Sequence, residues 1–333
     1  MVASLKFTAL ALAFFALALF LPYVVSPLLK KLQLVDTPNH RSAHTTPTIR
    51  GAGLAVALAI ILGLVASLFI FDLEANNLAI GVTVLLTVVL TAALGFIEDT
   101  RGISVKGRLG CQLLLSAAVA LWMLYLTDQH PIWAVPLALV GMFYINAANF
   151  MDGINGISSI HGILLGATAF IVGVLESNAA LLTIGSIISL SFLGFLPWNF
   201  PNAQMFLGDV GSYVVGGLYF AIGFWTFFVT GSLFLAIAPG LYYIFDVLYT
   251  LVVRKHRGKD LTEAHRDHLY QQLQRCQGSH VSATLIAVFI SFLVTVLALA
   301  GTYDLIPMPV TLLLCLVALL VLPLTLGKQR GPA

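Results

Sequence analysis

Residues 281–300 read Val281-Ser-Ala-Thr-Leu-Ile-Ala-Val-Phe-Ile290-Ser-Phe-Leu-Val-Thr-Val-Leu-Ala-Leu-Ala300, a stretch without a single charge. About 20 apolar residues are what an α-helix needs to cross the ~30 Å hydrocarbon core of a bilayer. The rest of the chain has the same character, because 59% of its 333 residues are hydrophobic and only 9% are charged. Soluble domains carry roughly 25% charged residues. The stretch and the composition predict an integral membrane protein.

Eleven apolar runs of this kind predict about eleven spans, all of them helical, because a helix satisfies its own backbone hydrogen bonds in lipid. The expected spans are 4–25, 51–71, 78–96, 109–127, 132–148, 157–175, 179–196, 211–229, 232–253, 281–300 and 306–326. The longest polar stretch, about 254–280, is too short for a domain of its own. We therefore expect an all-α polytopic fold with one membrane-embedded domain over residues 1–333.

The charged residues predict how the chain is oriented. All Lys and Arg residues except Lys6 lie in one set of alternate loops or in the C-terminal tail. The opposite loops contain neither Lys nor Arg. Their charged residues are all acidic: Asp72, Glu74, Asp128, Glu176 and Asp304. The positive-inside rule places the N-terminus outside and the C-terminus in the cytoplasm. Such an arrangement needs an odd number of spans.

The first two inside loops contain residues that suit ion binding: anions in the first loop and a metal cation in the second. In the first, His44 and Arg50 suit anionic oxygens, unless the cluster simply faces lipid headgroups. In the second, the carboxylates Glu98 and Asp99 end an apolar run, with Arg108 nearby. Paired carboxylates are costly there unless they are neutralised, and Mg²⁺ takes such ligands together with substrate phosphates. The alternative for the second loop is a salt-bridged helix end.

The third inside loop is a polar turn at membrane depth. Its side chains are Asn146, Asn149, Asp152 and Asn155. Irregular backbone at this depth occurs only inside protein or beside a water-filled cavity. The amides and the carboxylate suit a nucleobase or a ribose, and an ordinary helix-breaking turn is the alternative.

The fourth inside loop contains Asn199, Phe206 and Asp209 before an apolar run. Asp209 either caps the following helix, with help from Ser212, or ligates a metal ion. In the second case Phe206 is a stacking surface for a base.

The fifth inside loop contains His265, Arg266 and His268, which suit phosphate. The alternative is that the two histidines coordinate Zn²⁺, but no third coordinating residue of the usual kind lies nearby in the sequence. Asp246 lies within the ninth apolar run, ~12 Å from its end by helical rise. An ionisable group at such depth is functional or paired, and the sequence does not name its partner.

The order of these loops resembles the polyprenyl-phosphate N-acetylhexosamine-1-phosphate transferase family. The stretch from Asn146 to Gly156 matches the family element N-x-x-N-x-x-D-G-x-(D/N)-G, and the stretch from Gly208 to Ser212 matches G-D-x-G-S. The resemblance covers about residues 36–275. It implies transfer of N-acetylhexosamine 1-phosphate from a UDP-sugar to undecaprenyl phosphate in a bacterial inner membrane, with the active site on the cytoplasmic face, Mg²⁺ (or Mn²⁺) as cofactor and a homodimer as one assembly.

The resemblance also implies roles for individual residues. Asp209 and Asp99 are the expected metal ligands. The catalytic set is Glu98, Asp99, Asp152, Asp209 and His268. The substrate-binding set is His44, Arg50, Arg108, Asn146, Asn149, Asn155, Asn199, Phe206, His265 and Arg266.

The sequence departs from the family pattern at two positions. Glu98 stands where the family has Asp, and His268-Leu-Tyr270-Gln271 stands where a box H-x-H-H is usual. The histidine pattern H-R-x-H-x-Y-Q, which begins at His265, resembles the O-antigen-initiating bacterial branch. The rival functions are a transporter of a phosphorylated or nucleotide-linked solute and a CDP-alcohol phosphotransferase. The first needs polar groups along a path across the membrane, and the second needs an aspartate cluster that the sequence lacks.

Overall fold

The computed structural model describes residues 2–37, 47–70, 75–260, 263 and 265–328. This part of the chain contains eleven helices that are long and apolar enough to cross a membrane, which confirms the predicted fold class. They are α1 (Val2–Lys31), α2 (Gly53–Ile70), α3 (Ala75–Arg101), α4 (Val105–Leu126), α5 (Ala134–Met151), α6 (Ile157–Leu175), α7 (Ala179–Asn199), α8 (Gly208–Thr230), a broken ninth span, α12 (His280–Thr302) and α13 (Met308–Lys328).

The ninth span consists of α9 (Leu233–Ile237) and α10 (Leu241–His256), joined by the 3-10 helix η2 (Ala238–Gly240). Pro239 lies in this joint, where its missing N–H interrupts an α-helical ladder. Shorter elements complete the fold: the strands β1 (Val35–Asp36) and β2 (Thr48–Ile49), the 3-10 helix η1 (Pro131–Trp133) and the amphipathic α11 (Leu269–Gln277).

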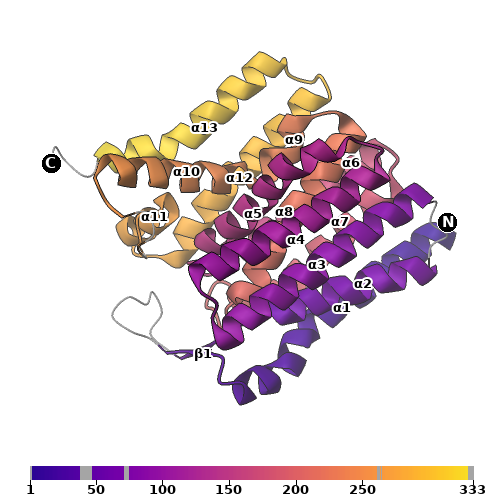
Figure 1. Cartoon of the computed structure of the whole chain (residues 1–333), viewed down its shortest axis with the longest axis horizontal. Helices are drawn as coiled ribbons and strands as arrows, with labels where there is room; N and C mark the ends of the chain where they lie inside the picture. Colours follow the sequence, from indigo (N-terminus) through magenta and orange to yellow (C-terminus); the bar gives the residue numbers. More distant parts are fainter. Residues whose placement is uncertain (1, 38–46, 71–74, 261–262, 264, 329–333) are drawn as a thin grey trace.

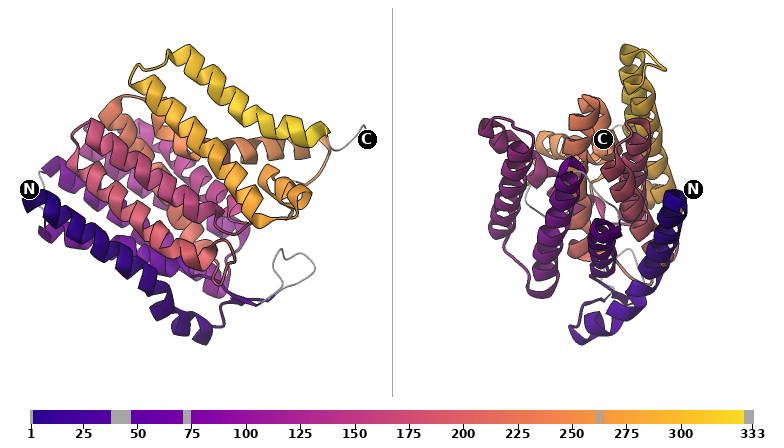
Figure 2. Two further views of the ribbon diagram at one scale, coloured as in Figure 1. Left: turned by 180° about the vertical axis from the view of Figure 1, so that it is seen from behind. Right: turned by 90° about the vertical axis from the view of Figure 1, so that its right-hand side faces the viewer.

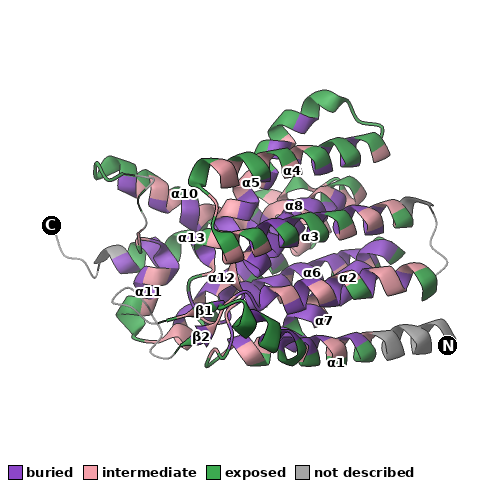
Figure 3. Cartoon of the chain, turned by 60° about the horizontal axis from the view of Figure 1, so that its bottom comes forward, coloured by how far each residue is buried: buried purple, intermediate pink, exposed green. Residues whose placement is uncertain are grey.

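Helix α8 lies at the centre of the bundle, and every residue from Val210 to Ile222 is buried. It packs against α3 and α5, while α6 packs against α7. The termini occupy opposite edges, with α1 beside α7 and α13 beside α12 (Figures 1 and 2). The outward faces of α4 and α5 remain exposed yet apolar, with Leu114, Tyr125 and Val135 among their side chains (Figure 3). Such faces suit lipid rather than water.

The short elements gather at one end of the bundle. In Figure 1, β1 and α11 lie at the end where α13 finishes, and α1 begins at the other end. Strand β1 pairs antiparallel with β2. The arrangement brings together the helix ends from which the predicted site residues come.

Candidate functional site

The first and fourth inside loops are joined through their backbones. Ile49 forms a parallel bridge with Met205. The Phe206 N–H donates to the Ile49 carbonyl at 2.7 Å, and the Ala52 N–H donates back to the Phe206 carbonyl at 3.0 Å. These bonds hold Arg50 directly beside the start of α8.

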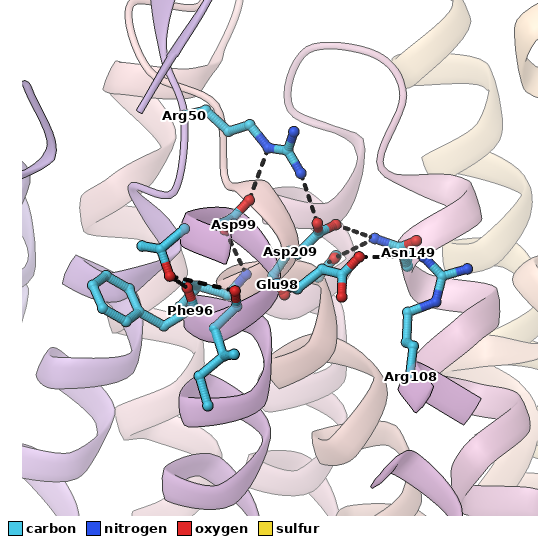
Figure 4. Close-up of polar contacts among 11 residues, drawn as sticks. Arg50, Phe96, Glu98, Asp99, Arg108, Asn149 and Asp209 are labelled. Atoms are coloured by element: carbon cyan, nitrogen blue, oxygen red, sulfur yellow. Dashed lines mark hydrogen bonds and ion pairs between the residues drawn. The ribbon is translucent and has the colours of Figure 1, made fainter. Parts of the chain in front are cut away.

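Arg50 joins two carboxylates from different helices. Its Nε lies 2.8 Å from Asp99 Oδ1, on α3, and its terminal Nη2 lies 2.6 Å from Asp209 Oδ2, on α8 (Figure 4). Burial lowers the pKa of Arg50, but Asp209 and Asp99 raise it by more, so the net pKa is raised. Arg50 therefore bridges two carboxylates that the sequence separates by more than 100 positions.

Asp99 also binds the end of α8. Its Oδ2 accepts the Val210 N–H at 3.0 Å, and its side chain is fully buried. The first N–H groups of a helix have no partner within the helix and attract negative charge. Asp99 thus holds α8 against α3 with one oxygen while the other faces Arg50.

Asp209 does not cap its own helix. It lies in the first turn of α8, and its Oδ1 accepts a hydrogen bond from Asn149 Nδ2 at 2.5 Å. The same amide donates to Ser212 Oγ at 3.2 Å. The capping alternative is therefore wrong: the carboxylate is directed toward Arg50 and Asn149, and the first four inside loops meet around it.

A cavity of about 440 Å³ opens beside this cluster. Nine predicted site residues line it: Arg50, Asn149, Asp152, Asn155, Asn199, Phe206, Asp209, His265 and Arg266. The sequence did not predict a further wall from α11 and the start of α12, formed by Gln271, Gln274, Arg275 and His280. The signal was present, because α11 is short and strongly amphipathic and its glutamines recur at helical spacing.

Glu98, Arg108 and Asn146 make their polar contacts outside the cavity lining, and Asp99 does not line the cavity either. Arg108 Nη1 lies 3.7 Å from Glu98 Oε1, and Asn146 Nδ2 donates to Gln112 Oε1 on α4 and to the Met142 carbonyl. Glu98 Oε2 is buried without a hydrogen-bond partner. Figure 4 shows Glu98 and Arg108 beside the Asp99–Arg50–Asp209 cluster. The salt-bridged helix end expected as an alternative is thus present at Glu98.

Asn199 lines the cavity, but its side chain is hydrogen-bonded to neighbouring residues of the protein. Its Oδ1 accepts from the Gly156 N–H at 3.0 Å and from Ser159 Oγ at 2.9 Å, and its Nδ2 donates to the Met205 carbonyl at 2.9 Å. These bonds use its hydrogen-bonding groups to tie the third loop to the fourth.

The histidines of the fifth loop differ in their surroundings. Burial lowers the pKa of His265 to about 4, with His268 and Arg254 acting in the same direction, so its ring is neutral at pH 7. Its Nδ1 accepts the Asp267 N–H at 3.3 Å, which leaves Nε2 as the donor. His268 is buried outside the cavity lining, with Nδ1 3.0 Å from Asp246 Oδ1. His44 lies outside the described residues.

The arrangement of carboxylates bears on the predicted metal ion. Among the described residues, no group of three or more His, Cys, Asp or Glu side chains is placed to hold a metal. Mg²⁺ is commonly bound by one or two carboxylates together with water and substrate phosphates. Asp99 and Asp209, which share one guanidinium, fit that smaller set. Both predicted metal ligands are thus close together. For Zn²⁺ held by His265 and His268, the described part of the chain supplies no third ligand.

Asp152 follows α5 and carries a testable pH dependence. Burial raises its pKa to about 7; a hydrogen bond with Ser158 opposes the shift, and Asp209 and Asp99 add to it. Since a free Asp titrates near ~3.9, the folded chain holds this proton more tightly, so the stability that the group contributes is fully present below about pH 4 and declines as the pH rises to 7.

Asp152→Asn, which is neutral at every pH, is therefore expected to raise the Tm by about 2–4 °C at pH near ~8 and to leave it unchanged at pH near ~4. Thermal unfolding in detergent at the two pH values measures this. An equal change of Tm at both would contradict the assignment.

Comparison with known proteins places these residues in a family. The model of glycosyl transferase family 4 matches residues 81–226, which contain the third- and fourth-loop motifs. A "Probable undecaprenyl-phosphate N-acetylglucosaminyl 1-phosphate transferase" of Bacillus subtilis (strain 168) is 23% identical over 303 residues, covering 86% of this chain and 83% of the relative.

Two further relatives agree. A "Decaprenyl-phosphate N-acetylglucosaminephosphotransferase" of Mycobacterium leprae (strain TN) is 27% identical over 322 residues, covering 84% of this chain and 78% of the relative. A "Phospho-N-acetylmuramoyl-pentapeptide-transferase" of Caldicellulosiruptor bescii is 32% identical over 241 residues, covering 64% of this chain and 72% of the relative. The chain therefore belongs to glycosyl transferase family 4, among its polyprenyl-phosphate N-acetylhexosamine-1-phosphate transferases.

Proposed function

We propose that this protein transfers N-acetylhexosamine 1-phosphate from a UDP-sugar to undecaprenyl phosphate, releasing UMP and forming the first lipid-linked intermediate of a cell-surface glycan. The observation that carries this proposal is that Arg50 joins Asp209 to Asp99, and that Arg50 and Asp209 line a cavity with polar side chains. The family relationship and the names of the relatives support the same reaction.

Phosphoryl transfer asks a protein mainly for charge neutralisation and in-line positioning. Arg266 and Arg275 line the cavity as cations, and neutral His265 offers an N–H donor, so this wall suits the diphosphate. Asn149, Asn155 and Phe206 line the cavity from other sides and suit the uridine. Mg²⁺ held by Asp99 and Asp209 would neutralise the diphosphate when bound. Without a cation, Arg50 pairs with both carboxylates.

The lipid phosphate is anionic at pH 7 and needs no strong base. We therefore favour its direct attack on the sugar-bearing phosphorus: a lipid-oxygen–phosphorus bond forms, the bond from that phosphorus to the bridging oxygen breaks, and UMP takes the electron pair. A phospho-aspartate intermediate is the alternative. Recovery of phosphorylated protein after incubation with UDP-sugar alone would replace our preference.

The distribution of basic residues supports an orientation of the protein in its membrane. The end of the bundle that holds the cavity also holds most of the basic residues of the described loops, which supports an active site on the cytoplasmic face of the membrane. That this is a bacterial inner membrane is proposed from the family relationship. The His265–Gln271 pattern favours the O-antigen branch of lipopolysaccharide synthesis. The names of the relatives differ in the lipid carrier and in the sugar. A panel of UDP-GlcNAc, UDP-GalNAc and 6-deoxy relatives is therefore the assay that identifies the sugar.

Release of UMP from purified protein in detergent tests the proposal. It should require UDP-sugar, undecaprenyl phosphate and Mg²⁺ together, and chelation should stop it. A transporter would carry solute across vesicles without releasing UMP, and that outcome would favour the rival function.

Phe206→Ala is expected to raise the KM for UDP-sugar by about tenfold or more and to change kcat at saturation little, because base stacking on an aromatic ring contributes roughly 1–3 kcal/mol. Phe206→Tyr, which keeps the ring, is the control and should behave as the parent. If Phe206→Ala lowers kcat at an unchanged KM, Phe206 is not a stacking surface.

A further inference from the structure

Asp246 is a carboxylate buried inside the membrane span α10, and most of its hydrogen-bond partners lie outside that helix. Oδ1 accepts from the Leu269 N–H at 2.9 Å and Thr250 Oγ1 at 3.1 Å, and lies 3.0 Å from His268 Nδ1. Oδ2 accepts from the Tyr270 N–H at 3.1 Å. The side chain is fully buried. Three of these four contacts go to the start of α11.

A second buried charged residue on α10, Arg254, binds Asp267, the residue before His268. Arg254, which is 3% exposed, donates through Nη1 to Asp267 Oδ2 at 2.6 Å and through Nη2 to the Asp260 carbonyl. Asp246 and Arg254 thus bind the adjacent residues His268 and Asp267 with opposite charges. One helix clamps the segment that leads into α11 at two successive positions.

The clamped segment builds one wall of the cavity. His265 and Arg266 precede the clamp, and Gln271, Gln274 and Arg275 follow it on α11. Between them, the Tyr270 hydroxyl donates to the Phe150 carbonyl at 2.8 Å. An added Cβ on Gly153 would overlap that hydroxyl, so Tyr270 packs closely on the turn that contains Asp152.

We propose that Asp246 is a positioning residue: from within the membrane it holds the start of α11, and so sets the wall of the cavity that receives the diphosphate and braces the Asp152 turn through Tyr270. His268 acts in the same device as the link between Asp246 and α11. A charged carboxylate suits this task better than a neutral acceptor, because it receives two backbone N–H groups from a helix start, where negative charge is favoured.

The proposal rests on the proposed function for its kinetic consequence alone. Asp246→Asn keeps the shape but turns one acceptor into a donor that faces the Tyr270 N–H. Its KM for UDP-sugar is expected to rise by about tenfold, the scale of one charge-assisted hydrogen bond, and that of Asp246→Ala by more. The KM for undecaprenyl phosphate should change by less than about threefold, because the contacts of Asp246 lead to the α11 wall.

A measurement without catalysis makes the test independent of the reaction. Cys276 on α11 and Cys111 on α4 are exposed, whereas Cys315 is buried. A nitroxide label on Cys276 in a Cys111→Ser background should report greater motion in both Asp246 variants than in the parent. A label on Cys111 in a Cys276→Ser background should report no difference.

Ser291→Ala is the matched control, since Ser291 is also buried within the bundle and its side chain bonds His161 Nε2 on α6 at 2.7 Å rather than a residue of α11. It should lower the Tm without changing the KM for UDP-sugar or the label at Cys276. The proposal is wrong if Asp246→Asn leaves the Cys276 spectrum and the KM for UDP-sugar as in the parent. Loss of label order in a chain whose parent releases no UMP would instead reject the proposed function and keep the clamp.

Discussion

Asp209→Asn is expected to lower the rate of UMP release by about a thousandfold, on the scale of removing a preorganised electrostatic group from an active site. The carboxylate receives Arg50 at 2.6 Å and Asn149 at 2.5 Å, and it lies at the wall of the cavity. An amide of the same shape carries no charge for a cation and turns one of the two acceptors into a donor that faces Arg50 or Asn149. The protein should remain folded and extractable, because the backbone contacts of α8 are unchanged.

Initial rates of UMP release at saturating substrates, over a range of Mg²⁺ concentrations, measure this loss. Asp128→Asn is the matched control, because Asp128 is an exposed acid between α4 and η1, outside the cavity lining, and Asn tolerates its positive φ of 53°. Its rate should equal that of the parent. If Asp209→Asn keeps more than about a tenth of the parent rate, Asp209 is not the group on which this chemistry depends.

Gly95→Ala is expected to reduce both activity and stability, although it adds only one methyl group and Gly95 does not line the cavity. Gly95 lies on α3, one turn before Asp99, and an added Cβ would overlap the Asp209 carbonyl oxygen and lie 2.6 Å from Val210 Cα. These are backbone atoms, which cannot rotate away as a side chain can. The start of α8 would have to move from α3, and with it Asp209 from Asp99.

The expected loss in UMP release is about a hundredfold, because a displacement near 1 Å at a catalytic group has effects of this size. The Tm should fall by several degrees, since overpacking costs about 1–3 kcal/mol. Gly110→Ala is the control: Gly110 lies on α4, and an added Cβ meets nothing within 4 Å. It should keep parent activity. Parent-like activity in Gly95→Ala would show that the spacing of α3 and α8 does not govern the reaction.

The local sequence determined which segments are helices and where most of them end. Lipid leaves a chain of this composition no alternative to helix, so apolar length alone predicts eleven spans. The break at Pro239 was the feature that length could not reveal, because residues 232–253 read as one uninterrupted run. Motif spacing likewise predicted Asn149, Asp152 and Asp209 as members of one site, and the structure brings them to one cavity.

Tertiary structure decided what each polar side chain contacts. The sequence leaves Asp209 as a cap or a ligand, and only the pairing of residues 49–53 with 205–207 places Arg50 beside it. Asp246 had no partner in the sequence because His268 lies 22 positions away, on a segment that returns to α10 only after the loop has closed. Whether a segment spans the membrane depends on its own apolar length. The partners of a buried carboxylate depend instead on which hydrogen-bond donors the packed helices bring close to it.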